Sequence, residues 1–116
     1  MEIPIAFIVE EAEQPGLEIR VNFGVFAGRE ATPAEIDELA RLILLDVADV
    51  SIVSEQRHEI SDDVEAAVHQ VRVEIAEDEL PADADEREQL AERVVATADL
   101  WARTSAAARH AEVSEL

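Results

Sequence analysis

Two histidines and the glutamates near them are the residues of this sequence whose types could hold a metal ion. His58 and His69 fall in two neighbouring strand patterns, and Glu55 and Glu59 lie close to the first of them. Imidazole nitrogens and carboxylate oxygens are ordinary ligands of zinc and related metals. However, the sequence contains no compact ligand spacing such as HxH or HExxH. We therefore interpret both histidines as polar residues of edge strands, and we expect no metal and no other cofactor.

Sequence motifs for catalysis are also absent. The chain has no cysteine, and its serines lack the context of a nucleophile elbow. Its three glycines form no phosphate-binding loop. Acidic residues are so numerous that no single carboxylate pair stands out for acid–base work. An enzyme with His58 or His69 as a base at the seam of a dimer is therefore only our third functional hypothesis, and we name no catalytic residue.

The charge of the chain narrows the class of partner. Its 28 acidic residues stand against nine arginines and no lysine, which gives a formal net charge of −19. Such a chain repels phosphates, so we expect neither a nucleic acid nor an anionic membrane as partner. The same charge favours a basic protein. We attribute the missing lysine first to genomic composition, and second to a surface that avoids lysine modification.

A single domain is expected for a chain of 116 residues, of which 48% are hydrophobic. We expect this domain to span residues 1–109, and we expect the tail 110–116 to fray because it has no hydrophobic periodicity. The first residues lack the basic start of a signal peptide, and their apolar run is too short to cross a bilayer. The expected location is therefore the cytoplasm.

Hydrophobic patterns predict four strands and two helices. Alternation with a period of two predicts strands, and apolar residues three or four positions apart predict amphipathic helices. Turn residues at 14–16 and 61–63 predict that the strands form two hairpins. The predicted strands span 3–12, 17–27, 50–60 and 65–77, and the predicted helices span 33–46 and about 84–108. The apolar phase changes within the fourth strand, which predicts either a bulge near His69 or pairing that begins only near Val68.

The helices have clear local signals. Thr32 can cap the first helix, Pro33 suits its first turn, and Glu35 completes a capping box. Asp83 or Asp85 can cap the second helix. Trp101, the only tryptophan, falls on the inward stripe of this second helix. We therefore interpret it as a core anchor rather than an interface residue.

The order strand, strand, helix occurs twice and predicts an α+β sandwich of two layers. Two hairpins can share one four-stranded antiparallel sheet whose helices cover one face. With the usual handedness of the crossovers, the sheet order is 1-2-4-3, which is the topology of a ferredoxin-like sandwich with its chain ends moved.

Such a sandwich leaves one sheet face without helices, and we expect function on this open face. Arg20 and Arg72 are expected on its central strands, while Ile8 and Phe26 are expected to give it apolar patches. Uncovered sheet faces commonly pack against another protein. Besides Ala6, the residues expected on the open face are Ile8, Arg20, Asn22, Phe26, Gln70, Arg72 and Glu74.

Our first functional hypothesis is a small, acidic, non-catalytic interaction protein: a regulator, adaptor or inhibitor of a basic partner that also self-associates, as a dimer first, through the open face. The second is a module that binds a small anionic ligand, gripped by Arg20 and Arg72, with Ile8 and Phe26 against its apolar part. The simplest alternative to both is a solvated face on which the arginines pair with neighbouring glutamates.

Overall fold

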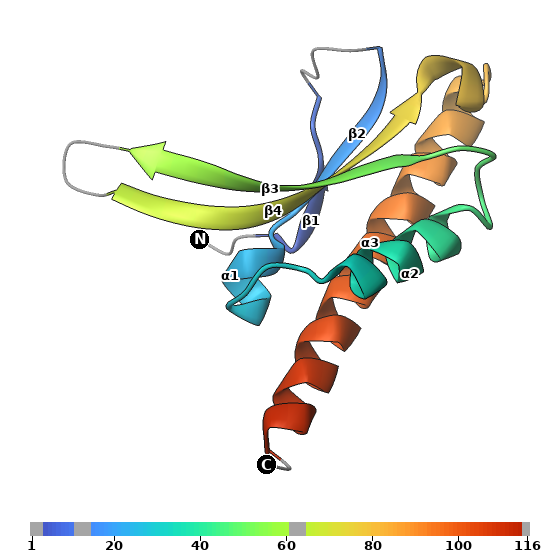
Figure 1. The fold of residues 1–116 in the computed structure, drawn as a ribbon. Coiled ribbons are helices and arrows are strands. Elements are labelled where there is room, and N and C mark those ends of the chain that lie inside the picture. Colours follow the sequence, from blue (N-terminus) through green and yellow to red (C-terminus); the bar gives the residue numbers. More distant parts are fainter. Residues whose placement is uncertain (1–3, 11–14, 61–64, 115–116) are drawn as a thin grey trace.

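The computed structural model describes residues 4–10, 15–60 and 65–114, with side chains placed for 4–10, 15–56 and 69–107. The fold is an α+β sandwich of two layers (Figure 1). Its strands are β1 (Ala6–Ile8), β2 (Gly16–Val21), β3 (Ser51–Ile60) and β4 (Glu65–Ala76), its helices are α1 (Phe23–Ala27), α2 (Pro33–Ile43) and α3 (Ala84–Ser114), and a 3-10 turn, η1, spans Glu77–Glu79.

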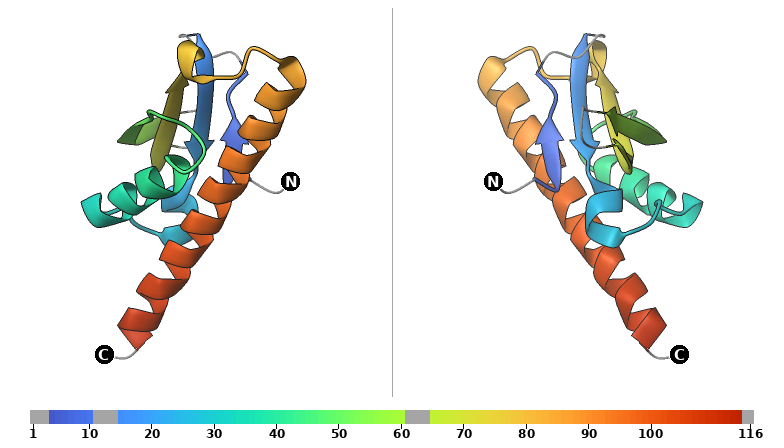
Figure 2. Two further views of the ribbon diagram at one scale, coloured as in Figure 1. Left: turned by 90° about the vertical axis from the view of Figure 1, so that its right-hand side faces the viewer. Right: turned by 90° about the vertical axis from the view of Figure 1, so that its left-hand side faces the viewer.

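The four strands form one antiparallel sheet in the order β1-β2-β4-β3, as the sequence predicts. Helices α2 and α3 lie across the same side of the strands (Figure 2). The opposite side is the open face. None of the helices in the described ranges has both the length and the apolar character needed to cross a membrane.

The core lies between the helices and the inner face of the sheet. Because β-strand side chains alternate, the odd-numbered residues of β2 and β4 face inward together. Each large apolar side chain buried in this way contributes about 1.5–3 kcal/mol to stability. The largest fully buried side chains are Ile19, Val21, Phe23, Leu39, Ile43, Val71, Val73, Ile75 and Val94.

The predicted second strand is too long, because β2 ends at Val21 and α1 begins at Phe23. Phe23 turns into the core, where its ring centroid lies 5.1 Å from that of Trp101. Gly24 lets α1 approach β4 closely, since a Cβ there would lie 2.9 Å from the backbone of His69. Gly28, with a φ of 72°, ends α1 in the left-handed conformation. Tertiary packing thus overrides a strand-like alternation that the sequence continues to Phe26.

The predicted faces of the first strand are reversed. Phe7 pairs with Arg20 and Ile8 pairs with Ile19, so Phe7 lies on the open face and Ile8 on the helix side. This segment is apolar at odd and even positions alike, so alternation alone cannot decide which set faces the core. Ile5 is also buried although it lies outside β1.

Strands β3 and β4 continue past the sheet as a two-stranded ribbon (Figure 1). Their register runs unbroken from Ser51 opposite Glu74 to Ile60 opposite Glu65. The predicted bulge near His69 and the alternative of pairing that begins only near Val68 are therefore both wrong. Strand β2 pairs only with residues 71–76 of β4. Residues 65–70 of β4 therefore have β3 as their only described strand neighbour. The predicted turn at 61–63 lies outside the described residues.

The capping predictions are confirmed. Thr32 Oγ1 accepts from Glu35 N and Glu35 Oε1 accepts from Thr32 N, which completes the capping box of α2. Asp83 caps α3, since its Oδ2 accepts from Glu86 N at 3.0 Å. Helix α2 ends at Ile43, three residues before the predicted end, whereas α3 runs to Ser114, beyond the predicted end near Ala108.

Candidate functional site

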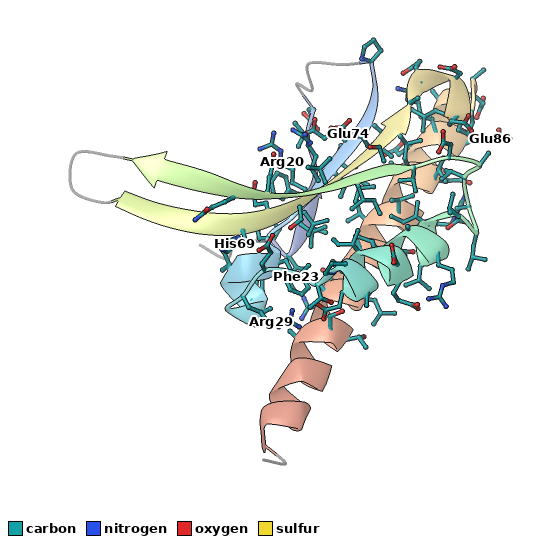
Figure 3. The ribbon with its side chains drawn as sticks, viewed as in Figure 1. Arg20, Phe23, Arg29, His69, Glu74 and Glu86 are labelled. Carbon is teal, nitrogen blue, oxygen red and sulfur yellow. The ribbon has the colours of Figure 1, made fainter. Side chains whose placement is uncertain are left out.

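The open face carries an ordered set of charges. Arg20 lies directly opposite Arg72, and Glu18 lies directly opposite Glu74, on the two central strands. Like charges that face each other across strands repel. In Figure 3, Arg20 and Glu74 lie apart from Phe23 and Arg29, which are beside α1.

Each arginine offsets this repulsion by binding a glutamate of its own strand. Arg20 Nε donates to Glu18 Oε2 at 2.9 Å, and Arg72 Nε lies 2.7 Å from Glu74 Oε1. Arg72 also has an Nη1 atom 3.6 Å from Glu55 Oε2. The Arg72–Glu74 contact is close but is not an aligned hydrogen bond. The arginines therefore pair with neighbouring glutamates.

A hollow of about 880 Å³ lies beside these charges, and we call it the open-face hollow. It is bounded by the start of β2, the end of β4 and the residues that lead into β3. Among the described residues, its charged lining consists of five carboxylates and two guanidiniums, from Glu18, Asp49, Glu74, Asp78, Glu79, Arg20 and Arg72. Because both guanidiniums already bind carboxylates, the hollow presents a surplus of negative charge.

Asn22 and Gln70 form a buried polar link under the open face rather than an exposed patch. Gln70 Nε2 donates to Asn22 Oδ1 at 2.7 Å, and Asn22 Nδ2 donates to the carbonyl oxygen of Pro4 at 2.8 Å. Both residues are buried. Gln70 Oε1 is buried without a hydrogen-bond partner in the described part of the chain, which costs stability. This link joins β4 to the cap of α1 and to the segment before β1.

Of the seven residues predicted for the open face, Arg20, Arg72 and Glu74 lie there and line the open-face hollow. Asn22 and Gln70 are close to it but buried. Ile8 faces the helix side, and Phe26 projects from α1 with 44% of its surface exposed. The apolar residues of this face that sequence reasoning missed include Phe7 and Val53, which end the cross-strand row through Arg20 and Arg72, and Val9, which lines the open-face hollow.

The proposed metal ligands do not come together within the described side chains. Glu55 lies opposite Gln70 and binds Arg72 on the open face, whereas His69 lies one position along β4, on the other face, against Gly24. The side chains of His58 and Glu59 lie outside the described residues. Among the residues that are described, no group of three metal-ligating side chains occurs.

A second cluster of charge lies on the helix side, and we call it the helix junction: Phe23, Arg29, Glu35 and Trp101. Arg29 donates to both carboxylate oxygens of Glu35, at 2.7 and 2.8 Å, and its guanidinium carbon lies 5.2 Å from the Phe23 ring centroid. Trp101 Nε1 donates to the Glu35 carbonyl oxygen at 2.9 Å. The junction therefore ties α1, α2 and α3 together.

The electrostatics of Glu35 follow from these contacts. Hydrogen bonds from Arg29 lower the pKa of the Glu35 carboxyl to about 2, against a smaller opposing effect of burial and with further help from Thr32. These contacts keep the carboxylate ionised, and they hold the helices of the junction together. The capping-box spacing and the inward Trp101 were the sequence signals for this cluster.

Comparison of this chain with protein-family models, with curated proteins and with solved structures gives no match.

Proposed function

We propose that this chain is a small non-catalytic interaction protein that binds a basic segment of a partner protein in the open-face hollow. The observation that supports this most is the described lining of the hollow, which combines five carboxylates with two arginines that already bind glutamates. An arginine or lysine of a partner would meet carboxylates there. The two guanidiniums of the hollow would repel it only weakly, because each already binds a glutamate. The net charge of −19 adds attraction at long range.

The same lining weighs against the hypothesis of an anionic ligand. An anion would have to compete with Glu18, Glu74 and Glu55 for the guanidiniums, and it would lie close to carboxylates on several sides. The apolar contacts expected from Ile8 and Phe26 are also absent from the hollow, because neither residue lines it. Among the described residues of the lining there is no histidine that could act as a general base.

Self-association through the open face is our second candidate. Rows of opposite charge, Glu18 with Glu74 and Arg20 with Arg72, lie side by side across the central strands. A twofold axis between the rows could place the arginines of one copy opposite the glutamates of another. The surplus of carboxylates in both hollows opposes this arrangement, so we rank it below a basic partner. Light scattering across a concentration series tests it, and a monomer at every concentration would remove it.

A charge-matched pair of variants tests the binding proposal. The hollow variant is Asp49→Asn with Glu79→Gln, and the control is Asp37→Asn with Glu38→Gln on α2. Both remove two negative charges, and Glu38 contributes only an exposed ion pair to Arg41. The probe is the peptide acetyl-Gly-Arg-Gly-Arg-Gly-amide, titrated calorimetrically at low salt.

We expect the hollow variant to weaken binding of this peptide by about tenfold, and the control variant to weaken it by no more than about twofold. Affinity of the native chain should fall steeply as salt is added, because the contacts are ionic and partly exposed. Equal losses in the two variants would show that only net charge matters, and that outcome would contradict a site in the hollow.

A further inference from the structure

A second hollow lies at the β1 edge of the sheet, between β1 and α3. It has a volume of about 500 Å³ and is lined by Ile8 of β1 and by Glu92, Val95, Ala96 and Asp99 of α3. We call it the edge groove. It shares no lining residue with the open-face hollow.

The backbone of β1 is oriented toward this groove at Ile8. Val9 N donates to Glu18 O, and Ile5 O accepts from Asn22 N, both at 2.8 Å. In an antiparallel pair, alternate residues direct their N–H and C=O groups to the same neighbour. The odd-numbered residues of this segment therefore bond to β2, and the backbone groups of Ile8 point away from it. Within the described sheet, β1 has β2 as its only strand neighbour.

The side chains at the groove are apolar in the centre and acidic at the borders. Ile8 is 39% exposed although it faces the helix layer, and Val95 and Ala96 continue the apolar surface on α3. Glu92 and Asp99 border it one helical turn to either side. Asp99 binds Arg103, whereas Glu92 has no ion pair within the described part of the chain.

We propose that the edge groove binds an extended segment of a partner protein, which adds as a strand beside β1, places an apolar side chain between Ile8 and Val95, and places a basic side chain beside Glu92. An outward-facing strand edge next to a helix provides both elements of strand addition, because the backbone groups give affinity and the groove selects alternate side chains. The carboxylates select a basic segment by charge complementarity.

A second copy of this chain fits the groove less well. A symmetric pairing of two β1 edges would bring Glu92 of each copy into one interface, in a chain of net charge −19.

The test uses a peptide that prefers an extended conformation and places valine and arginine on the same face, acetyl-Thr-Arg-Thr-Val-Thr-Arg-amide. The variant Ala96→Arg fills the groove from an exposed helix position, so the fold is retained. Ala107→Arg, which is also exposed on α3 and makes the same change, is the matched control. Two analogues of the peptide, N-methylated at every threonine or at the valine and both arginines, remove one set of its backbone donors each.

We expect Ala96→Arg to weaken binding of the peptide by about tenfold or more, and Ala107→Arg to change it by less than about twofold. At least one N-methylated analogue should bind more weakly by a similar factor, and amide exchange at Ile8 should slow when the peptide is present. Replacing Asp49 and Glu79 in the open-face hollow should leave the Ala96 dependence unchanged, so this inference and the proposed function can fail separately.

Three results would overturn the inference. The first is equal binding to the Ala96→Arg and Ala107→Arg variants. The second is undiminished binding of both N-methylated analogues, because strand addition needs the backbone donors. The third is a concentration-dependent dimer of the native chain that Ala96→Arg dissociates, because the occupant would then be a second copy.

Discussion

Arg29 at the helix junction and Arg72 on the open face both bind glutamates, but their surroundings differ. Arg29 binds Glu35 through two aligned hydrogen bonds and lies over the ring of Phe23, which is fully buried in the core. Arg72 lies between two glutamates in a half-exposed row beside a hollow that contains further carboxylates. The same pair of residue types therefore fixes helices in one place and borders an acidic hollow in the other.

If the helix junction is structural, truncating its largest ring should reduce stability more than any of the substitutions below. Trp101→Ala removes the contact with Phe23 and the hydrogen bond to the Glu35 carbonyl oxygen, and it leaves a cavity. We expect a loss of about 3–5 kcal/mol in the free energy of unfolding, measured by urea denaturation with circular dichroism.

Leu100→Ala is the matched control, since Leu100 is the neighbour of Trp101 on α3 but is 66% exposed. It should change the same free energy by less than about 0.5 kcal/mol. Similar losses in the two variants would show that the junction does not depend on Trp101.

We expect the next largest loss of stability where α1 closely approaches β4. In Gly24→Ala the new methyl group would lie 2.9 Å from the His69 backbone, so α1 must shift and stability should fall by about 1–3 kcal/mol. In Gly28→Ala no atom lies within 4 Å of the new methyl group, so only the left-handed φ of 72° is penalised, by about 1 kcal/mol. A Gly24→Ala protein more stable than Gly28→Ala, in the same thermal or urea unfolding experiment, would contradict the observed packing of α1.

The ion pair of the junction can be isolated by Glu35→Gln, which keeps the capping-box geometry but loses the charge. Because the folded-state pKa of Glu35 is lowered to about 2 from an ordinary 4.5, its stabilisation is fully present above pH 4.5 and is lost as the pH falls toward 2. The native chain should exceed Glu35→Gln by about 1 kcal/mol near neutral pH, and this difference should vanish in acid. Urea midpoints over a pH series measure it, and a difference that does not depend on pH would exclude the ion pair as its cause.

On the open face, removal of an arginine should have the smallest effect on stability. Arg72→Met keeps the aliphatic stem of the side chain and removes contacts to Glu55 and Glu74 that are about one-third exposed. We expect a change below about 1 kcal/mol in the free energy of unfolding. The open-face hollow would become more negative, so the basic peptide should bind more tightly. Weaker binding of the peptide would mean that Arg72 contacts the ligand directly, which would contradict our assignment of the carboxylates.

The strand order and the helix caps could be predicted from sequence because each rests on local signals that agree with one another. Thr32, Pro33 and Glu35 specify one helix start, and the odd-numbered apolar residues of 17–21 and 71–75 specify one inner face. The first strand offers no such agreement, since it is apolar at every position from 3 to 9, and its phase is decided by contacts with α3.

Helix α1 and the partners in the ion pairs could be identified only from the three-dimensional structure. The alternation from Val21 to Val25 is compatible with a strand, and only the packing of Phe23 on Trp101 and of Gly24 on β4 favours a helix. The arginines of the open face were placed correctly, but their glutamate partners could not be assigned from spacing, because acidic residues occur near every arginine of this chain.

The central claim is that the open face binds a basic partner while the helix junction only stabilises the fold. Chemical-shift mapping of the whole chain by NMR, during titration with acetyl-Gly-Arg-Gly-Arg-Gly-amide at low salt, tests it most directly. We predict that the largest shifts occur at the hollow residues Glu18, Asp49 and Glu74, and that the indole N–H of Trp101 does not move. Shifts centred on Trp101 and Glu35, with an unchanged hollow, would contradict the claim.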